Sequence, residues 1–202
     1  MTSSPGSTIG LEDTLKAILP EGKFAGPLPP VHLWNPPNCG DIGMEIRADG
    51  TWFYMGTPIG RAPLVRLFST VLRKDEDGKT YLVTPVEKVG IRIQDAHFVA
   101  VEMSVTEIDG AQVLTFRTNV GDVVEAGGAH PLRFVIHGEN HQLKPYLHVR
   151  GRLEALVSRA VMYDLVEKGE VREIDGRAMF VVCSGGAVFP VMPAAELERL
   201  SK

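Results

Sequence analysis

Cysteine is almost absent from this chain of 202 residues. The two cysteines, Cys39 and Cys183, lie far apart and lack the close spacing of metal ligands. We therefore expect reduced cysteines that pack in the fold rather than a disulfide or a zinc site.

Long apolar runs are also missing. No stretch approaches the roughly 20 apolar residues that a membrane-spanning helix needs. Residues 1–10 have neither the basic start nor the apolar segment of a signal peptide. We therefore expect a cytoplasmic protein without a membrane span.

The chain has no excess of positive charge. Its formal net charge is −4 and its pI is about 5.9, so we expect no sequence-independent attraction to nucleic-acid phosphates. Hydrophobic residues make up 44% and charged residues 23% of the sequence. This composition is typical of a globular protein with enough apolar material for a core.

The standard catalytic and nucleotide-binding motifs are absent too. The sequence contains no phosphate-binding loop, no dinucleotide fingerprint after a strand and no serine nucleophile elbow. His137 and His141 are four residues apart, but Gly138 and Asn140 between them favour a polar turn over a metal-binding helix. The acidic run 75–77 is interpreted as a solvated turn. We expect no metal, no cofactor and no identifiable catalytic residue.

The pattern that is present is the Asp-Gly hairpin. Apolar alternation flanks Asp49-Gly50, Asp109-Gly110 and Asp175-Gly176, and Asp-Gly favours the tight turn between two antiparallel strands. Helical patterns lie beside the first and the last of these hairpins. The three copies fit either a duplicated unit or a common turn device used three times.

The other elements predict an α+β protein with two β-rich halves. Helical spacing is found at residues 11–19, 62–73, 153–167 and 194–201, and strands fill most of the middle. A proline-rich strap covers residues 20–37. We expect an N-terminal tail and helix at 1–22, an α+β domain at 23–90 and a β-rich domain at 91–202.

The best candidate for a ligand site follows the first hairpin. Arg61 ends a glycine-rich turn before a helix start, which favours anion binding. A candidate set lies around it: Trp52 and Tyr54 as ring-stacking surfaces, Arg66 one helical turn onward, and Thr84, Glu87 and Lys88 between two strands. The alternative is that Arg61 and Glu87 form a structural ion pair and that the aromatic rings pack in the core.

A second basic group surrounds the helix expected at 153–167. Arg150, Arg152 and Arg159 cluster near its start, where positive charge opposes the helix dipole unless an acid or a bound anion compensates. We therefore include Arg150 and Arg152 among the candidate ligand-binding residues, although surface solvation explains many short basic runs.

Several stretches resemble a bacterial family, domain of unknown function 1285. The resemblance covers about residues 25–190 and is carried by Cys39-Gly40-Asp41-Ile42, Asp49-Gly50-Thr51-Trp52-Phe53-Tyr54, Pro58-Ile59-Gly60-Arg61, Leu64-Val65-Arg66-Leu67-Phe68-Ser69 and Leu82-Val83-Thr84-Pro85-Val86-Glu87-Lys88-Val89. It implies a repeated structural motif, a C-terminal half similar to pleckstrin-homology domains, and a nucleotide-like ligand between the halves in signalling. Gly43 and Met55 depart from the bulkier or more polar residues expected at their positions.

Three hypotheses follow. The first is a non-enzymatic regulatory protein that binds a small anionic, nucleotide-like molecule. The second is an enzyme that acts on a phosphorylated or nucleotide substrate with residues assembled only in the fold, such as Asp41, Glu87 and His137. The third is a protein-interaction module whose strand edges accept a partner.

Overall fold

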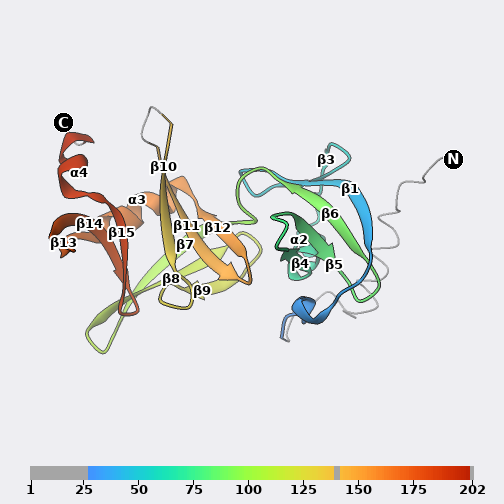
Figure 1. Ribbon diagram of the computed structural model, residues 1–202, viewed down its shortest axis with the longest axis horizontal. Helices are drawn as coiled ribbons and strands as arrows, with labels where there is room; N and C mark the ends of the chain where they lie inside the picture. The colour runs from blue at the N-terminus through green and yellow to red at the C-terminus, as the bar shows by residue number, and fades with distance from the viewer. Residues whose placement is uncertain (1–26, 139–141, 201–202) are drawn as a thin grey trace. The chain divides into compact units, whose positions relative to one another are not determined.

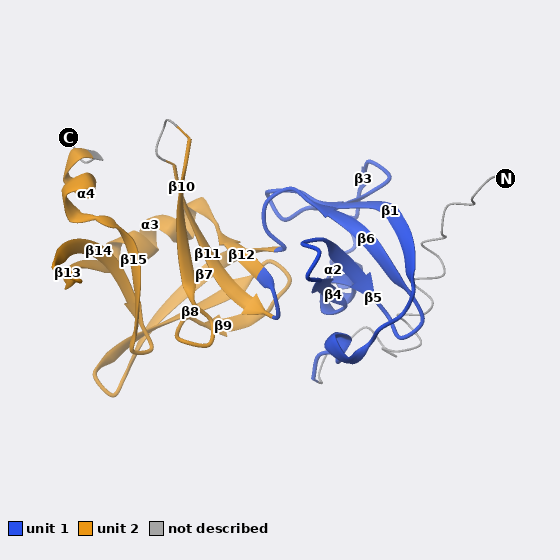
Figure 2. Ribbon diagram, in the orientation of Figure 1, with its two compact units in different colours: residues 1–97, 151–153 blue, residues 98–150, 154–202 orange. Residues whose placement is uncertain are grey.

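A computed structural model describes residues 27–138 and 142–200 (Figure 1). The helix expected at 11–19 and His141 lie outside the described residues. The chain divides into two compact units (Figure 2): unit 1 comprises residues 1–97 with 151–153, and unit 2 comprises residues 98–150 and 154–202. The expected boundary at 90/91 falls inside one strand, Lys88–Ile93, which belongs wholly to unit 1.

Unit 1 contains one six-stranded sheet. Its elements are η1 (Val31–Leu33), β1 (Asn38–Ile46), β2 (Trp52–Tyr54), β3 (Thr57–Pro58), α2 (Ala62–Thr70), β4 (Leu72–Lys74), β5 (Thr80–Val83) and β6 (Lys88–Ile93). The strand order is β3-β2-β1-β6-β5-β4. The first and last strands, β1 and β6, are parallel neighbours, and the other neighbours are antiparallel.

The core of unit 1 lies between α2 and one face of this sheet. Trp52 is 1% exposed and stacks on Phe68 of α2, with 6.2 Å between ring centroids. The helix was expected to reach residue 73 but ends at Thr70. Leu72 instead pairs with Leu82, because its side chain is buried equally well from an edge strand.

Unit 2 contains a second six-stranded sheet and a smaller one. The first is built from β7 (Phe98–Ile108), β8 (Ala111–Thr118), β9 (Val123–Glu125), β10 (Leu132–His137), β11 (Gln142–Arg150) and β12 (Leu153–Val157). After it come α3 (Arg159–Glu167), β13 (Gly169–Ile174), β14 (Arg177–Ser184), β15 (Ala187–Pro193) and α4 (Ala194–Leu200), and β13, β14 and β15 form a three-stranded sheet.

The two large sheets share one strand order. In unit 2 the order is β10-β11-β12-β7-β8-β9, and the parallel neighbours are again the first and last strands, β7 and β12. Numbered from its own first strand, each sheet therefore has the order 3-2-1-6-5-4. This agrees with two β-rich halves that repeat a motif, whereas the likeness of the second half to pleckstrin-homology domains stays a prediction.

The helix predicted over residues 153–167 is wrong at its start. Residues Leu153–Val157 form β12, and the helix begins at Arg159. In this segment Leu153, Ala155 and Val157 are buried while the residues between them are partly exposed, which is the period of a strand. The Oγ of Ser158 accepts the backbone N–H of Val161 and caps the helix.

The Asp-Gly turns are of two kinds. Asp109 and Asp175 both have positive φ, at 52° and 50°, as in the two-residue hairpin turn that favours Asp-Gly. Asp49 instead accepts the Thr51 N–H with its side chain, and Asp77 does the same for Lys79. In this second kind only the glycine has positive φ.

Candidate functional site

Unit 1 carries a polar face on the side of its sheet away from α2. Alternate residues of a strand point to opposite faces, and Tyr81 pairs across the sheet with Arg73 and with Gly90, which pairs with Asp41. We use the name polar face for the side chains that share this side: Asp41, Glu45, Arg73, Tyr81, Lys88 and Arg92.

Two cations of the polar face, Arg73 and Lys88, meet at the carboxylate of Asp75 in the turn after β4. Its two oxygens accept from Arg73 Nε at 2.6 Å and Nη2 at 3.2 Å, and Lys88 Nζ donates to the same group at 2.8 Å. All three side chains are only 18–20% exposed. Burial opposes the charge of Asp75, but the bonds from Arg73 and Lys88 outweigh it and hold the carboxyl pKa below its usual value.

The turn after β4 also binds the hydroxyl of Tyr81. Its hydroxyl donates to Asp77 Oδ2 at 2.6 Å, and Lys88 Nζ lies 4.4 Å from the centre of its ring. The hydrogen bond to Asp77 is the main reason that the pKa of Tyr81 rises to about 12, followed by burial and by the nearby acids. The run 75–77, which we expected to be a solvated turn, therefore organises this face.

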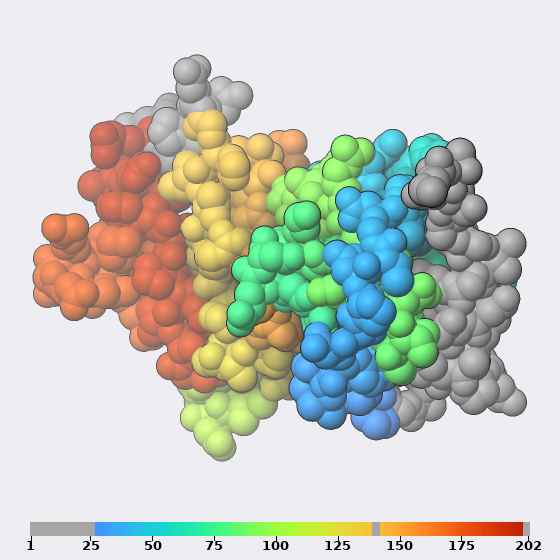
Figure 3. All heavy atoms as spheres, turned by 45° about the vertical axis from the view of Figure 1, so that its right-hand side comes forward, coloured from blue at the N-terminus to red at the C-terminus, as the bar shows by residue number. Residues whose placement is uncertain are grey.

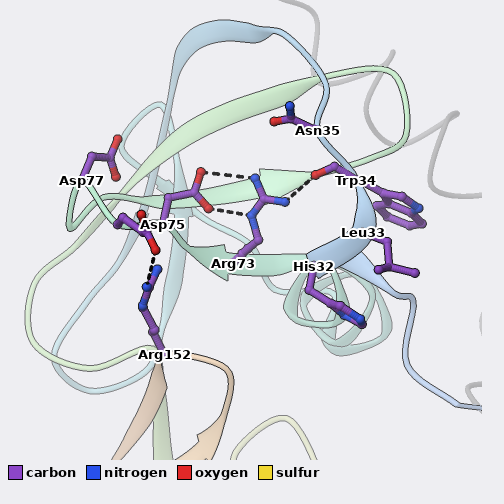
Figure 4. A pocket seen from close by; sticks show the side chains of 9 residues that line it. His32, Leu33, Trp34, Asn35, Arg73, Asp75, Asp77 and Arg152 are labelled. Carbon is purple, nitrogen blue, oxygen red and sulfur yellow. Dashed lines mark hydrogen bonds and ion pairs between the residues drawn. The ribbon is translucent and has the colours of Figure 1, made fainter.

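Arg73 also holds the strap that precedes β1. Its Nη1 donates to the carbonyl oxygen of Val31 at 2.7 Å and to that of Trp34 at 2.6 Å. Figure 4 shows the bond to Trp34. The described part of the strap, residues 27–37, lies at the surface of unit 1, where Figure 3 shows it in the deepest blue. One guanidinium therefore ties the strap to the sheet through two hydrogen bonds and binds Asp75 through two more.

A pocket of about 470 Å³ opens between the strap and the turn after β4. It is lined by His32, Leu33, Trp34, Asn35, Arg73, Asp75, Glu76, Asp77 and Arg152, and Figure 4 shows these side chains. Arg152 belongs to unit 1 and forms an ion pair with Glu76 at 2.9 Å, with exposed fractions of 53% and 89%. We call this cavity the strap pocket.

A second pocket of about 530 Å³ lies over β1 and β6. Its lining comes from β1, from the start of β5 and from β6: Asp41, Gly43, Met44, Glu45, Gly78, Lys79, Thr80, Gly90, Ile91, Arg92 and Ile93. We call it the seam pocket. The turn after β4 supplies residues to both pockets and separates them.

The first group of predicted site residues is not gathered in either pocket. The ring of Trp52 packs in the core and offers no face to a ligand. Tyr54 is half-buried on β2, Arg61 is the residue before the first turn of α2, and Arg66 is exposed on that helix.

The second group forms a turn and part of the polar face. Thr84 is fully buried, and its hydroxyl oxygen accepts the backbone N–H of Glu87 at 3.1 Å. This contact closes the turn between β5 and β6. Lys88 begins β6 and binds Asp75, so Thr84 and Glu87 shape the turn that delivers Lys88.

The two arginines predicted before the second long helix do not lie at its start. Arg150 ends β11, pairs with Asp122 at 2.6 Å and lies over the Phe98 ring. Arg152 lies in the following turn and lines the strap pocket. The dipole argument fails for both, because β12 separates them from α3.

No group of three or more potential metal ligands occurs among residues 27–138 and 142–200. His137 is exposed at the end of β10 in unit 2, whereas Asp41 and Glu87 belong to unit 1. No helix in the described part of the chain is long and apolar enough to cross a membrane.

The two-unit β-rich architecture agrees with comparisons to known proteins. Residues 29–96 match the model of the N-terminal domain of a domain of unknown function, DUF1285, and residues 97–191 match that of its C-terminal domain. The chain therefore belongs to the DUF1285 family, as the sequence motifs predicted. No curated protein matches it.

Two crystal structures are similar to this chain. A DUF1285 family protein from Silicibacter pomeroyi DSS-3 is 48% identical, with a TM-score of 0.81, and the match covers 98% of this chain and 100% of that one. A DUF1285 family protein from Shewanella baltica OS155 is 26% identical, with a TM-score of 0.49 over 62% of this chain and 91% of that one.

Proposed function

We propose that this protein is a non-enzymatic regulator that binds a small anionic, nucleotide-like ligand in the strap pocket. The observation that carries the proposal is the exposed ion pair between Arg152 and Glu76 at the pocket wall. A role in signal transduction is what the family resemblance implies.

Arg152 is the cation that an incoming anion can engage. Exposed ion pairs contribute only about 0–1 kcal/mol, so an anion displaces Glu76 at little cost, and Glu76 returns to water. A guanidinium presents paired donors that match a carboxylate or a phosphate. Arg73 is unsuited to this role, because Asp75 and two strap carbonyls already use its donors.

The other charges of the strap pocket limit what it accepts. Asp75 is compensated by Arg73 and Lys88, and Asp77 accepts the hydroxyl of Tyr81. Both carboxylates still repel a multiply charged group nearby. The strap pocket therefore favours one negative charge, as in a phosphodiester, over a triphosphate.

The strap supplies an aromatic surface. Trp34 lines the pocket and is only partly buried, and its indole can stack on a base while His32 on the same wall donates or accepts hydrogen bonds. Trp34 therefore replaces Trp52, whose ring is buried, as the proposed ring-stacking residue.

The test is a thermal-shift and calorimetric screen of cyclic mononucleotides, cyclic dinucleotides and nucleoside triphosphates. We expect a diester to raise the melting temperature of the wild type and Arg152→Ala to weaken its binding roughly tenfold. Glu76→Ala should strengthen binding, because it removes the competing carboxylate.

Two controls keep the result specific. Arg172→Ala removes an arginine of similar exposure that pairs with Glu170 in unit 2, and it should leave binding unchanged. Arg61→Ala tests the helix-start site expected from the sequence. Loss of binding in Arg61→Ala but not in Arg152→Ala would move the ligand to α2, and no response to any nucleotide contradicts the proposal.

One observation favours a protein-interaction module as a second candidate. In the described residues, β7 pairs with β12 only over Phe98–Ala100, and from Glu102 to Ile108 it pairs only with β8. Over residues 102–108, the edge of β7 that faces away from β8 can therefore accept a strand of a partner protein. Val105→Pro should abolish capture of such a partner, and unchanged capture would exclude this edge.

A further inference from the structure

The seam between β1 and β6 is irregular. Asn38 pairs with Lys88, Asp41 with Gly90 and Glu45 with Arg92, so β1 uses three and then four residues where β6 uses two. Gly40 and Gly43 take positive φ angles of 90° and 65° within these bulges. Bulges commonly redirect side chains beside functional sites, and here they lie at the wall of the seam pocket.

The carboxylate of Asp41 lies flat over Gly90. A Cβ on residue 90 would overlap Asp41 Oδ1 and lie 3.1 Å from its Cγ. The φ of Gly90 is not in the left-handed region, so its backbone does not require glycine. The missing side chain at residue 90 instead makes room for the carboxylate on the floor of the pocket.

Asp41 has no cationic partner in the described part of the chain. Its negative charge adds to the repulsion that raises the pKa of Tyr81, together with the charges of Asp75 and Asp77. Within the described residues the Asp41 side chain makes no hydrogen bond or ion pair that would stabilise the fold.

Lys79 carries a positive charge in the same pocket as the negative charge of Asp41. It belongs to the turn that enters β5, lines the same pocket, is exposed and pairs with no carboxylate among residues 27–138 and 142–200. β1 and β5 flank β6, and adjacent strands are spaced by about 4.8 Å. β1, which carries Asp41, and β5, which Lys79 directly precedes, are therefore roughly 10 Å apart, a span that a ligand with two charged ends can bridge.

The remaining charges of the seam pocket are already matched. Arg92 pairs with Glu45 at 3.0 Å, and Glu45 also accepts from the Gln94 side chain. The bonds from Arg92 and Gln94 hold the pKa of Glu45 below its usual value despite opposing desolvation. Asp41 and Lys79 are thus the two charges left for a ligand.

We propose that the seam pocket binds a small zwitterion of the amino-acid type, with Asp41 binding its ammonium group and Lys79 its carboxylate. The pocket volume of about 530 Å³ suits a small molecule. A ligand of one sign would satisfy one of the two groups and be repelled by the other. This site is independent of the strap pocket.

The experiment is calorimetric titration of the full chain with a panel of α-, β- and γ-amino acids. We expect at least one to bind, and we expect its N-acetyl derivative and its decarboxylated amine each to bind roughly tenfold more weakly, because each loses one ion pair. Absence of binding by every member of the panel at about 10 mM overturns the proposal.

Three variants locate the site. Asp41→Asn and Lys79→Gln should each weaken binding roughly tenfold. Gly90→Ala keeps every charge but displaces the Asp41 carboxylate, so it should weaken binding as Asp41→Asn does. Asp109→Asn, at an exposed turn of unit 2, is the matched control and should leave binding unchanged.

The outcomes separate this proposal from the proposed function. Arg152→Ala should leave amino-acid binding intact, and Asp41→Asn should leave nucleotide binding intact. The melting temperature of Asp41→Asn should equal or exceed that of the wild type, which excludes unfolding as the cause of lost binding. Amino-acid binding that is lost in Arg152→Ala and kept in Asp41→Asn overturns the assignment to the seam pocket.

Discussion

The two six-stranded sheets have the same strand order but differ in how their first and last strands meet. In unit 1, β1 and β6 run side by side from Asn38 to Ile46 with two bulges, whereas in unit 2 the parallel contact is limited to Phe98–Ala100 and Ala155–Val157. Long, bulged pairing gives unit 1 a hollow lined by charged side chains. The two sheets thus share a strand order, and in unit 1 the bulged pairing of the first and last strands lies at the wall of the seam pocket.

The Asp-Gly turns also differ between the two units. The Asp49-Gly50 and Asp77-Gly78 turns of unit 1 are held by an aspartate side chain, whereas Asp109-Gly110 and Asp175-Gly176 of unit 2 place the aspartate itself at positive φ. In unit 1 the aspartate side chain accepts the backbone N–H of the residue after the glycine, which in one turn is Lys79 of the seam pocket. The Asp-Gly dipeptide occurs in both units, but the aspartate stabilises the turn with its side chain in unit 1 and adopts a positive φ in unit 2.

The largest effect is expected from truncating the two cores. Trp52→Ala in unit 1 and Phe116→Ala in unit 2 each remove a ring that is at most 1% exposed, and each should lower the free energy of unfolding by about 3–5 kcal/mol. The measurement is urea denaturation, followed by tryptophan fluorescence and by far-UV circular dichroism.

The two probes distinguish the units, because both tryptophans, Trp34 and Trp52, belong to unit 1. If each unit unfolds on its own, Phe116→Ala should shift the dichroism transition and leave the fluorescence transition in place. Trp52→Phe is the conservative control and should cost less than Trp52→Ala. Coincident transitions in every variant would show that the units unfold together.

The next effect tests a bulge at the parallel seam between β1 and β6 of unit 1. Gly43 and Met55 both departed from the expected family pattern, and they contact each other: a Cβ on residue 43 would lie 2.7 Å from Met55 Sδ. Gly43→Ala also meets a φ of 65°. We expect a loss of about 1–2 kcal/mol in urea denaturation.

The double variant Gly43→Ala/Met55→Ala separates the two causes. Removing the Met55 side chain relieves the overlap but leaves the backbone strain, so it should restore only part of the lost stability. Full restoration would show that the positive φ of residue 43 costs nothing. No restoration would show that the methionine moves aside freely.

A smaller effect compares the two kinds of turn. Asp49→Gly removes the 2.9 Å bond from the Thr51 N–H and should cost about 0.5–1.5 kcal/mol. Asp109→Gly relieves a non-glycine residue at a φ of 52° and should change stability by less than about 0.5 kcal/mol. Equal losses in thermal denaturation would show that the two turns have the same energetics.

Local signals in the sequence predicted much of the fold. The Asp-Gly dipeptides located hairpins in both units, and the motifs identified the family. The helix predicted at 62–73 ran past its true end at Thr70, and the helix predicted at 153–167 began too early, because a short apolar segment fits a buried strand as well as a helix. Only the pairing of Leu72 with Leu82 and of Ala155 with Phe98 decided between them.

The candidate site was less predictable, since it depends on contacts across strands. Asp75, Arg73 and Lys88 are separated in sequence but meet on one face of the sheet. The alternation of apolar and polar residues at 80–83 and 88–93 predicts strands. It does not predict their register, which places Tyr81 opposite Gly90 and Gly90 opposite Asp41. Trp52 and Tyr54 are the aromatic residues near Arg61 in the sequence, but proximity in the sequence does not show that the Trp52 ring packs against Phe68 of α2.

The smallest effect at neutral pH concerns the tyrosine of the polar face. Ionisation of Tyr81 breaks its hydrogen bond to Asp77, and its pKa is raised from 10.0 to about 12 in the folded protein. Because the Tyr81 pKa is higher in the folded than in the unfolded protein, the protonated hydroxyl stabilises the fold at pH values below about 10. This stabilisation is lost as the pH rises from about 10 to about 12. Tyr81→Phe should therefore lessen the fall in melting temperature over this range. Tyr163→Phe, at an exposed tyrosine of unit 2, is the control, and an equal change in both variants would refute a special role for the polar face in alkaline stability.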